Sequence, residues 1–316
     1  MKAERIKIPG YDEVWRVDLE DTIAFVSLHA IIQNRTFGGI RIRPYPDEKE
    51  ALRDAMALSL AMSRKVALTG IEGGGAKTVV ITPEKNRSEA IRKLGAFIDS
   101  LHGRYYAGAD FGCTSEDISL VAQETKYVAS EDLSPHTART VLLCLEALDL
   151  PKVAAVQGLG SIGLPVAKAL QEQGVRVITS DLSPVKEFEA VEPDKIYETE
   201  CDLFSPCATG GVLDKESIDR LRCKVICGGA NNPLASDQDA ERLRERGILY
   251  IPDFISNSGA TIYGASKTIN EEDQIETRFQ AIPSLVGEIL EQAEKESRSP
   301  HFVAIAKADA RISSLR

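Results

Sequence analysis

The sequence predicts an α/β protein of two domains, in which an N-terminal α/β domain precedes a doubly wound parallel sheet, with a cleft between them. The chain has 316 residues, which at about 150 residues per domain suggests one large or two ordinary domains. The residues up to about 137 mix strands with at least three helices. From about residue 150 short apolar strands alternate with helices, which is typical of a parallel sheet covered on both faces.

Composition excludes several classes of protein. Apolar residues make up 43% of the chain and charged residues 27%, so it can bury a sizeable core. A net charge of −10 disfavours nucleic acid and anionic membranes as partners. No apolar run approaches the ~18 residues that span a bilayer, and the charged N-terminus does not resemble a signal peptide. The six cysteines form no CxxC pair and the four histidines show no ligand spacing, so we expect free thiols, no metal and a cytoplasmic protein.

The local patterns place the main elements. Asp47 and Glu50 resemble a capping box, and the apolar spacing that follows predicts a helix ending near Lys65. Helical spacing also covers 164–174. Short apolar runs predict strands at 153–158, 175–181, 202–207, 224–229 and 248–253. Loops after parallel strands open on one edge, and here they are rich in Gly, Asn and Ser, so this edge is a candidate binding site.

A glycine-rich turn follows the first of these strands. Gly158 permits a tight turn, Gly160 lets the backbone approach a pyrophosphate at a helix N-terminus, and Gly163 lets helix pack on strand. Asp181 ends the second strand, 23 residues after the first glycine, where a carboxylate binds ribose hydroxyls and repels a 2′-phosphate. The pattern favours NAD over NADP. The alternatives are a tight turn that binds no nucleotide and, for Asp181, a solvated acid at a strand end.

Two lysines, Lys65 and Lys77, flank a glycine run at 73–75 that predicts a sharp turn beside a ligand. Two ammonium groups in one pocket would disfavour each other's charge, and burial would add to this, so one pKa should fall toward neutrality. That lysine could act as a base while the other holds a carboxylate. Asp110, after an aromatic-rich run, could lie at the mouth of a strand. The alternatives are two surface lysines and a turn-forming aspartate.

At this point the sequence resembles the glutamate/leucine/phenylalanine/valine dehydrogenases, nearest the leucine and phenylalanine branch. The resemblance runs in order over roughly residues 25 to 265. The matching stretches are FGGIRIRPYP, AMSRKVALTGIEGGGAKTVVI, RYYAGADFG, SPHT, VAAVQGLGSIG, CDLFSPCATGGVL, VICGGANNPL and IPDFISNSG.

The resemblance implies reversible oxidative deamination of an L-amino acid to a 2-oxo acid and ammonia, with hydride transfer to NAD. Lys65 corresponds to the lysine that binds the substrate carboxylate, helped by the backbone around Gly38 and Gly39. Lys77 corresponds to the lysine that activates water, and Asp110 to the acid that exchanges protons with the substrate nitrogen. The residues expected to bind the cofactor are Gly158, Gly160, Ser161, Ile162, Gly163, Asp181, Thr137, Ala208, Ala230, Asn231 and Asn232.

The resemblance also narrows the substrate. Glutamate enzymes have a lysine where Phe37 stands, which argues against glutamate. Gly108, Thr261 and Gly264 should line the side-chain pocket, and two glycines there favour a bulky apolar or aromatic amino acid. The alternative is that a neighbouring side chain fills the space.

The chain departs from the family in two places. A bulkier residue usually stands at Gly73 and a glycine at Ala76, and the segment between Tyr127 and Ser134 is short. These departures keep open a relative that binds nucleotide or amino acid without turnover. A further alternative is another two-domain oxidoreductase, of the shikimate or folate type, which would prefer NADP.

The resemblance implies a domain organisation as well. We expect a substrate domain over residues 1–137 and a Rossmann domain that binds NAD over 138–284. The final segment, about 285–316, should return to the first domain. The family is commonly oligomeric through the first domain, so we expect a homo-oligomer.

Overall fold

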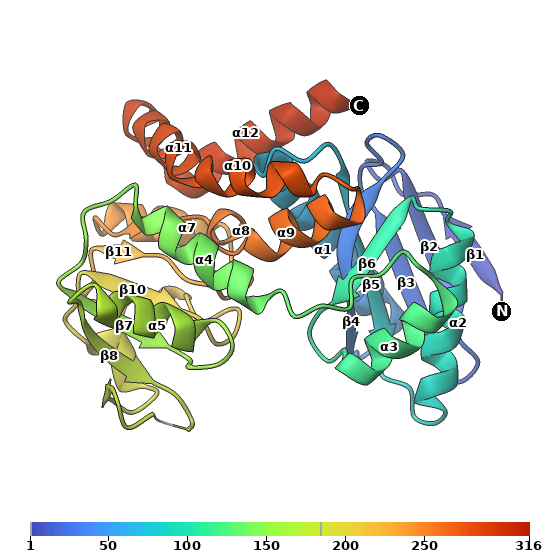
Figure 1. Ribbon diagram of the computed structural model, residues 1–316, viewed down its shortest axis with the longest axis horizontal. Helices are drawn as coiled ribbons and strands as arrows, with labels where there is room; N and C mark the ends of the chain where they lie inside the picture. The colour runs from blue at the N-terminus through green and yellow to red at the C-terminus, as the bar shows by residue number, and fades with distance from the viewer. Residues whose placement is uncertain (1, 184) are drawn as a thin grey trace. The chain divides into compact units, whose positions relative to one another are not determined.

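The computed structural model describes residues 2–183 and 185–316, and the chain divides into two compact units (Figure 1). Unit 1 consists of the residues up to Asp132 together with Gly264–Glu272 and Ala308–Arg316. Unit 2 consists of Leu133–Tyr263 and Asp273–Lys307. The C-terminal segment that belongs to unit 1 is therefore Ala308–Arg316. It is shorter than the expected segment of about 285–316, because residues 285–307 belong to unit 2.

Unit 1 is built on a six-stranded mixed sheet in the order β1-β2-β3-β5-β4-β6. β4 runs parallel to both β5 and β6, whereas β1, β2, β3 and β5 are joined by antiparallel pairs. The strands are β1 (Ala3–Ile6), β2 (Glu13–Asp18), β3 (Ile23–Leu28), β4 (Thr36–Arg43), β5 (Gly74–Ile81) and β6 (Tyr105–Ala109). The helices are α1 (Glu48–Leu68), α2 (Arg87–Ser100) and α3 (Ser115–Glu124).

Alternation along the strands gives this sheet two buried faces. Ile40 and Ile42 of β4 join one core with residues of α2 and α3, such as Leu94. Phe25 and Val79 face the other way and pack with Ala55 of α1. Since side chains of a strand alternate between faces, Phe37, Gly39, Arg41 and Lys77 lie on the α1 face of the sheet.

Helix α1 begins as expected and ends later than expected. The side chain of Asp47 accepts a hydrogen bond from the backbone N of Glu50, 2.8 Å away, which caps the first turn. The helix continues to Leu68 instead of ending near Lys65, because Val66 and Ala67 extend its buried face. Gly70, at φ +76°, then takes the left-handed conformation that follows many helices.

The glycine run at 73–75 is not the turn that the sequence suggested, since β5 begins at Gly74. Its glycines serve close packing instead. A Cβ at Gly75 would lie 2.0 Å from the backbone N of Ser63 in α1, and one at Gly74 would lie 1.4 Å from the carbonyl oxygen of Ala30. The absence of a side chain at Gly75 lets the backbone of β5 contact that of α1, and the absence of one at Gly74 lets it contact the backbone of Ala30.

The C-terminal residues pack on unit 1. Ala308 and Ile312 join a core with Ala67. Arg64 of α1 binds Asp309 through two nitrogens, with Nε 2.9 Å from Oδ1 and Nη2 3.0 Å from Oδ2. This bidentate pair fixes the last two turns against the helix that carries Lys65.

Unit 2 is built on a six-stranded sheet in the order β12-β11-β10-β7-β8-β9, and every pair in it is parallel. Numbered within the unit, this order is 3-2-1-4-5-6 read from β9, which is the doubly wound dinucleotide-binding topology. The predicted fold class is confirmed. The strands are β7 (Val153–Gln157), β8 (Arg176–Ser180), β9 (Glu189–Ala190), β10 (Leu203–Pro206), β11 (Val225–Ile226) and β12 (Leu249–Tyr250).

Helices accompany this sheet. They are α4 (Ser134–Leu145), α5 (Gly163–Glu172), η1 (Lys195–Glu198), α6 (Lys215–Arg220), α7 (Gln238–Glu245), α8 (Asp253–Ser256), α9 (Gly259–Thr268), η2 (Glu272–Gln274), α10 (Ile275–Gln280), α11 (Ile282–Glu296) and α12 (Pro300–Leu315). Residues of α9 and α12 are shared between the two units. None of the helices in the described part of the chain has the length and apolar character needed to cross a membrane.

The contact between Gly75 and Ser63 yields a stability prediction. Gly75→Ala should destabilise unit 1 by about 1–3 kcal/mol, because the new methyl group meets backbone that cannot move aside. Urea unfolding followed by the fluorescence of Trp15 measures this directly, since the chain's single tryptophan lies in β2 of unit 1. Gly108→Ala is the matched control in the same sheet, because no atom lies within 4 Å of its added Cβ. Equal stability of the two variants would contradict the packing role.

Candidate active site

Unit 1 brings two of the expected catalytic side chains into contact. Lys77 lies on β5 and Asp110 directly follows β6, one strand beyond β4. The Lys77 Nζ atom lies 2.8 Å from the Asp110 Oδ2 atom. The Lys77 side chain is only 6% exposed and that of Asp110 17%, so the pair is largely removed from water.

Arg41 of β4 is a third charged residue in contact with this pair. It was not among the residues predicted from the sequence. Its Nε donates to Asp110 Oδ2 at 2.8 Å, and its Nη1 donates to Asp54 Oδ2 of α1 at 3.3 Å. The hydroxyl of Tyr45 also donates to Asp54. The signal lay in the quoted stretch FGGIRIRPYP, where an arginine two residues after Gly39 must share its face of the strand.

The pKa values of the pair shift for different reasons. Burial lowers the pKa of the Lys77 amine below its ordinary value of 10.5; the charge of Asp110 opposes this and that of Arg41 adds to it. Burial would raise the pKa of Asp110, but Lys77 and Arg41 outweigh burial and lower it to about 2. Arg41 is thus one cation that lowers the pKa of Lys77, in addition to the effect that the sequence suggested for Lys65.

Glycines shape the space around the pair. A Cβ at Gly39 would lie 2.8 Å from the Asp110 Cβ and 3.3 Å from the Lys77 Nζ, so only glycine fits beside both groups. A Cβ at Gly38 would lie 1.7 Å from the carbonyl oxygen of Ala76. Gly108 is paired with Gly39 across the β4–β6 ladder and has open space where its side chain would be. The sheet therefore leaves room next to the charged groups.

Aromatic side chains border this space. The Phe37 ring stacks on Tyr106, with centroids 5.6 Å apart and an interplanar angle of 22°. Phe37 is buried with Val66, Ile71 and Ala265, and the absence of a side chain at Gly73 admits its ring edge. Phe37, the residue directly before Gly38 and Gly39, is therefore part of an apolar wall and carries no charge.

Lys65 lies half-buried in the last turn of α1, next to Val66 in the Phe37 cluster. Of the expected pocket residues on α9, Gly264 belongs to unit 1, and its neighbour Ala265 packs in that cluster. Thr261 belongs to unit 2 and is half-buried there.

The glycine-rich turn of unit 2 has the geometry of a tight βα turn. Gly158 has φ +88° and its N donates to the Ser180 carbonyl oxygen at 2.7 Å. A Cβ at Gly163 would lie 1.9 Å from the Gly158 carbonyl oxygen, whereas the space around Gly160 is open. The turn is therefore tightly packed behind and accessible at Gly160, and the exposed Ser161 and half-buried Ile162 follow.

Asp181 connects the first two strands at this edge. Its Oδ2 accepts a hydrogen bond from the backbone N of Leu159 at 2.6 Å, and its Oδ1 accepts one from Ser183 at 2.7 Å. These two bonds lower the pKa of its carboxyl group. Because each oxygen of a carboxylate accepts two hydrogen bonds, this charged group keeps capacity for hydroxyl donors.

The loops after the remaining strands meet this turn. A Cβ at Gly158 would lie 2.8 Å from that of Ala208, and the N of Gly211 donates to the Asn232 carbonyl oxygen at 2.8 Å. The N of Asn232 in turn donates to Asp253 at 2.9 Å, and the buried Ala230 donates to the Pro206 carbonyl oxygen at 3.0 Å. The loops that follow β7, β8, β10, β11 and β12 therefore lie together along one edge.

Two polar residues at this edge were also missed. The Nδ2 of Asn257 donates to Asn231 Oδ1 at 3.1 Å. Among the residues that the structure describes, neither the buried Oδ1 of Asn257 nor the buried hydroxyl of Ser258 has a hydrogen-bond partner. Their signal was the stretch IPDFISNSG. Thr137, expected beside the cofactor, is buried on α4 of the same unit.

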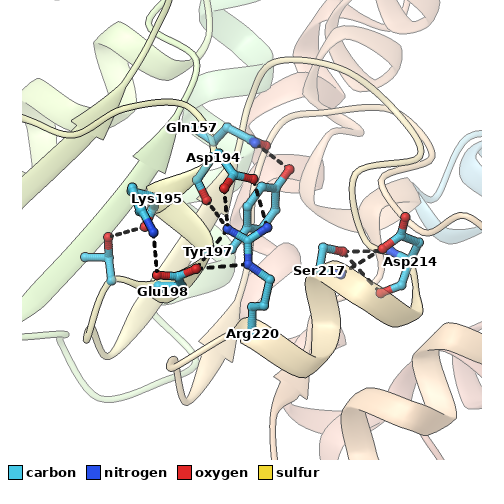
Figure 2. A network of polar contacts seen from close by, with 9 residues as sticks. Gln157, Asp194, Lys195, Tyr197, Glu198, Asp214, Ser217 and Arg220 are labelled. Carbon is cyan, nitrogen blue, oxygen red and sulfur yellow. Dashed lines mark hydrogen bonds and ion pairs between the residues drawn. The ribbon is translucent and has the colours of Figure 1, made fainter.

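A polar network supports the strand that leads into the glycine turn (Figure 2). The Nε2 of Gln157, the last residue of β7, donates to the Tyr197 hydroxyl at 2.8 Å. The guanidinium of Arg220 lies over the Tyr197 ring, 5.5 Å from its centroid, and binds Asp194 and Glu198. The network links β7, η1 and α6.

The open glycine, the free capacity of Asp181 and the unpartnered polar atoms of Asn257 and Ser258 fit a dinucleotide along this edge. By contrast, residues 2–183 and 185–316 contain no group of three or more His, Cys, Asp or Glu side chains that could hold a metal ion. All six cysteines are free thiols.

Comparisons with known proteins agree with this geometry. Residues 179–310 match the family described as Glutamate/Leucine/Phenylalanine/Valine dehydrogenase, and residues 16–132 match the Glu/Leu/Phe/Val dehydrogenase, dimerisation domain. A leucine dehydrogenase of Thermoactinomyces intermedius is 35% identical, over 93% of this chain and 88% of the relative.

A second relative and a solved structure give the same relationship. An L-tryptophan dehydrogenase of Nostoc punctiforme is 34% identical over 92% of this chain and 90% of the relative. A crystal structure of L-tryptophan dehydrogenase from Nostoc punctiforme covers 97% of each chain, at 32% identity and a TM-score of 0.84. The chain belongs to the glutamate/leucine/phenylalanine/valine dehydrogenase family, on its leucine and phenylalanine side, and is an amino-acid dehydrogenase, an oxidoreductase.

Proposed function

We propose that this enzyme catalyses the reversible, NAD-dependent oxidative deamination of an L-amino acid with an apolar or aromatic side chain, giving the 2-oxo acid and ammonia. The observation that carries the proposal is the buried contact between Lys77 and Asp110 beside the open space at Gly108. Buried acid–base groups with shifted pKa values in a space of this kind are typical of catalytic sites.

Lys77 and Asp110 divide the proton transfers. A lysine whose pKa is lowered by burial is neutral in part of the population at alkaline pH. Its amine can accept a proton from the water that attacks Cα of the iminium formed when hydride is removed from the substrate. Asp110 remains a carboxylate and exchanges protons with the substrate nitrogen. Lys65, with the backbone of Gly38 and Gly39, holds the substrate carboxylate.

Unit 2 holds the cofactor. The turn from Gly158 to Gly163 binds the pyrophosphate and Asp181 binds the adenosine ribose, which favours NAD because a carboxylate repels a 2′-phosphate. Thr137, Ala208, Ala230, Asn231 and Asn232 line the rest of its site. NAD, when bound, supplies the hydride acceptor that the reaction requires.

The side chain of the substrate occupies the apolar part of unit 1. Phe37 and Tyr106 supply a stacked aromatic wall without a cation, which disfavours glutamate, and the open space at Gly108 admits a large group. Gly264, which also belongs to unit 1, leaves further room for this side chain. The named relatives support this class, because they are leucine and tryptophan dehydrogenases.

We also infer a homo-oligomer that assembles through unit 1. The family model that matches residues 16–132 is described as a dimerisation domain. In addition, β1 is an exposed edge strand that pairs only with β2 within the described chain. Exposed strand edges readily pair with another chain.

A panel of L-amino acids with NAD tests the function. Formation of NADH should be at least about 100-fold faster with leucine, phenylalanine or tryptophan than with glutamate, because no cation stands at Phe37 to meet a side-chain carboxylate. The rate should rise with pH, because Lys77 must lose its proton, and the rising limb of kcat/KM should lie below the ordinary lysine pKa of 10.5. Clear NAD binding without turnover of any amino acid would instead support a relative that only binds.

Lys77→Ala tests the proposed base. We expect kcat to fall by about 10² to 10⁴, the usual contribution of a general base, while the dissociation constant of NAD changes little. Lys126→Ala removes an exposed lysine of unit 1 and is the matched control. Stopped-flow rates and fluorescence titration with NADH measure the two quantities, and unchanged turnover in Lys77→Ala would refute the mechanism.

Asp181→Ala tests the cofactor preference. We expect the dissociation constant of NAD to rise about tenfold or more, because a hydrogen bond to a charged group contributes about 1.5–3 kcal/mol, and discrimination against NADP to weaken. Asp149→Ala removes one exposed acid from the same unit, so the loss of negative charge alone is controlled. An unchanged ratio of NAD to NADP affinity would exclude the role of Asp181.

A further inference from the structure

We propose that Arg41 is a positioning residue for the deamination: it holds the Asp110 carboxylate by its Oδ2 atom and leaves the Oδ1 atom for the substrate nitrogen. The inference rests on the proposed function and adds a residue to its machinery. It starts from the two oxygens of Asp110, which have different surroundings.

All contacts to the Asp110 carboxylate converge on one oxygen. Oδ2 accepts from Lys77 Nζ and from Arg41 Nε, each at 2.8 Å, which fills its two acceptor positions. Within residues 2–183 and 185–316, no hydrogen bond reaches Oδ1. A carboxylate held in this way presents one free oxygen in a fixed direction.

Arg41 is itself held from the opposite side. Its Nη1 donates to Asp54 Oδ2 at 3.3 Å, and Asp54 accepts a further hydrogen bond from Tyr45. The two carboxylates engage different nitrogens, so the plane of the guanidinium is fixed and its side chain is only 15% exposed. A lysine could not replace this geometry, because its single ammonium lacks the planar fork.

The charge of Arg41 matters because Lys77 changes its own. With Lys77 protonated, two cations balance Asp110 and Asp54. When Lys77 gives up its proton, Arg41 is the cation that still contacts Asp110. Without Arg41 the buried carboxylate would then become protonated. Arg41 never deprotonates, so Asp110 stays charged through the cycle. The network then carries one net negative charge, which a substrate ammonium at Oδ1 neutralises.

Arg41 also affects the pH at which Lys77 titrates. In the described part of the chain, the charged groups with the largest effect on Lys77 are Asp110, Arg41 and Asp54, and among them Arg41 lowers its pKa. The Cys113 thiol, whose pKa burial raises to about 12, lies near Asp110 and stays neutral over the range tested. Burial likewise raises the pKa of the Tyr105 hydroxyl, the other titratable group near Asp110.

Three variants test the inference. Arg41→Gln removes the charge, Arg41→Lys keeps the charge without the fork, and Arg53→Gln is the control, since Arg53 is an exposed arginine of α1 that pairs with Glu50. For each, kcat and KM are measured from pH 7 to 11 on the best substrate of the wild type. Circular dichroism and thermal unfolding check that the variants fold.

Arg41→Gln should move the rising limb of kcat/KM to higher pH by about one unit, because Lys77 loses a neighbouring like charge. It should lower kcat by about 10-fold or more and change KM less, since the residue acts on proton transfer. Arg41→Lys should return the limb most of the way toward the wild type while kcat stays reduced. Arg53→Gln should match the wild type in both.

A second measurement does not depend on turnover. The rate at which acetic anhydride labels Lys77, read by mass spectrometry as a function of pH, reports the pKa of its amine, and Arg41→Gln should raise that pKa by about one unit. A folded Arg41→Gln with an unmoved limb and an unmoved labelling pKa would overturn the role of Arg41. Wild-type protein without turnover on any amino acid would overturn the proposed function, while the labelling would still test the contact.

Discussion

The arrangement of unit 1 depends on keeping a lysine and an aspartate in contact away from water. Moving each charge out of water costs several kcal/mol, and the attraction between the two offsets this only where the geometry and the remaining hydrogen bonds are good. Lys77 and Asp110 meet that condition through Arg41, which shares the Asp110 Oδ2 atom with Lys77 at the same 2.8 Å. Arg41 keeps Asp110 charged, whereas its own positive charge lowers the pKa of Lys77.

Glycine makes the close approach of these charges possible. Gly39 stands between Lys77 and Asp110, where any side chain would press on both, and Gly75 lets α1 lie on the strand that carries Lys77. Glycine loses more conformational entropy on folding than other residues, and here it occupies positions where a side chain would not fit. The same substitution would be tolerated at Gly108, which faces open space. Gly39 and Gly108, which are paired across the β4–β6 ladder, thus have different roles: close packing requires the first, and the second leaves open space.

Much of the fold could be predicted because its signals are local. Apolar strands, helical spacing and the turn at Gly158 predicted the doubly wound parallel sheet, and the structure adds its strand order. The glycines at 74 and 75 could not be interpreted in this way, since a strand glycine and a turn glycine look alike until the contacting helix is known. The later end of α1 depends likewise on tertiary burial of Val66 and Ala67. The role of Arg41 could not be predicted, because its partner Asp54 lies on helix α1 and the contact between the two forms only when the helix packs on the sheet.

In the proposed active site, strand β4 carries the residues for substrate selectivity and those for proton transfer at different positions. Its alternate residues Phe37, Gly39 and Arg41 share one face, and successive members of this series lie about 6–7 Å apart along the strand. Phe37 belongs to the aromatic wall, Gly39 gives access to the charged pair, and Arg41 holds Asp110. Because the three are fixed by one backbone, a change at Phe37 can alter which side chain is accepted without moving the groups that transfer protons. Under the proposed function, such a strand lets the side-chain preference of the enzyme change while its acid–base groups stay the same.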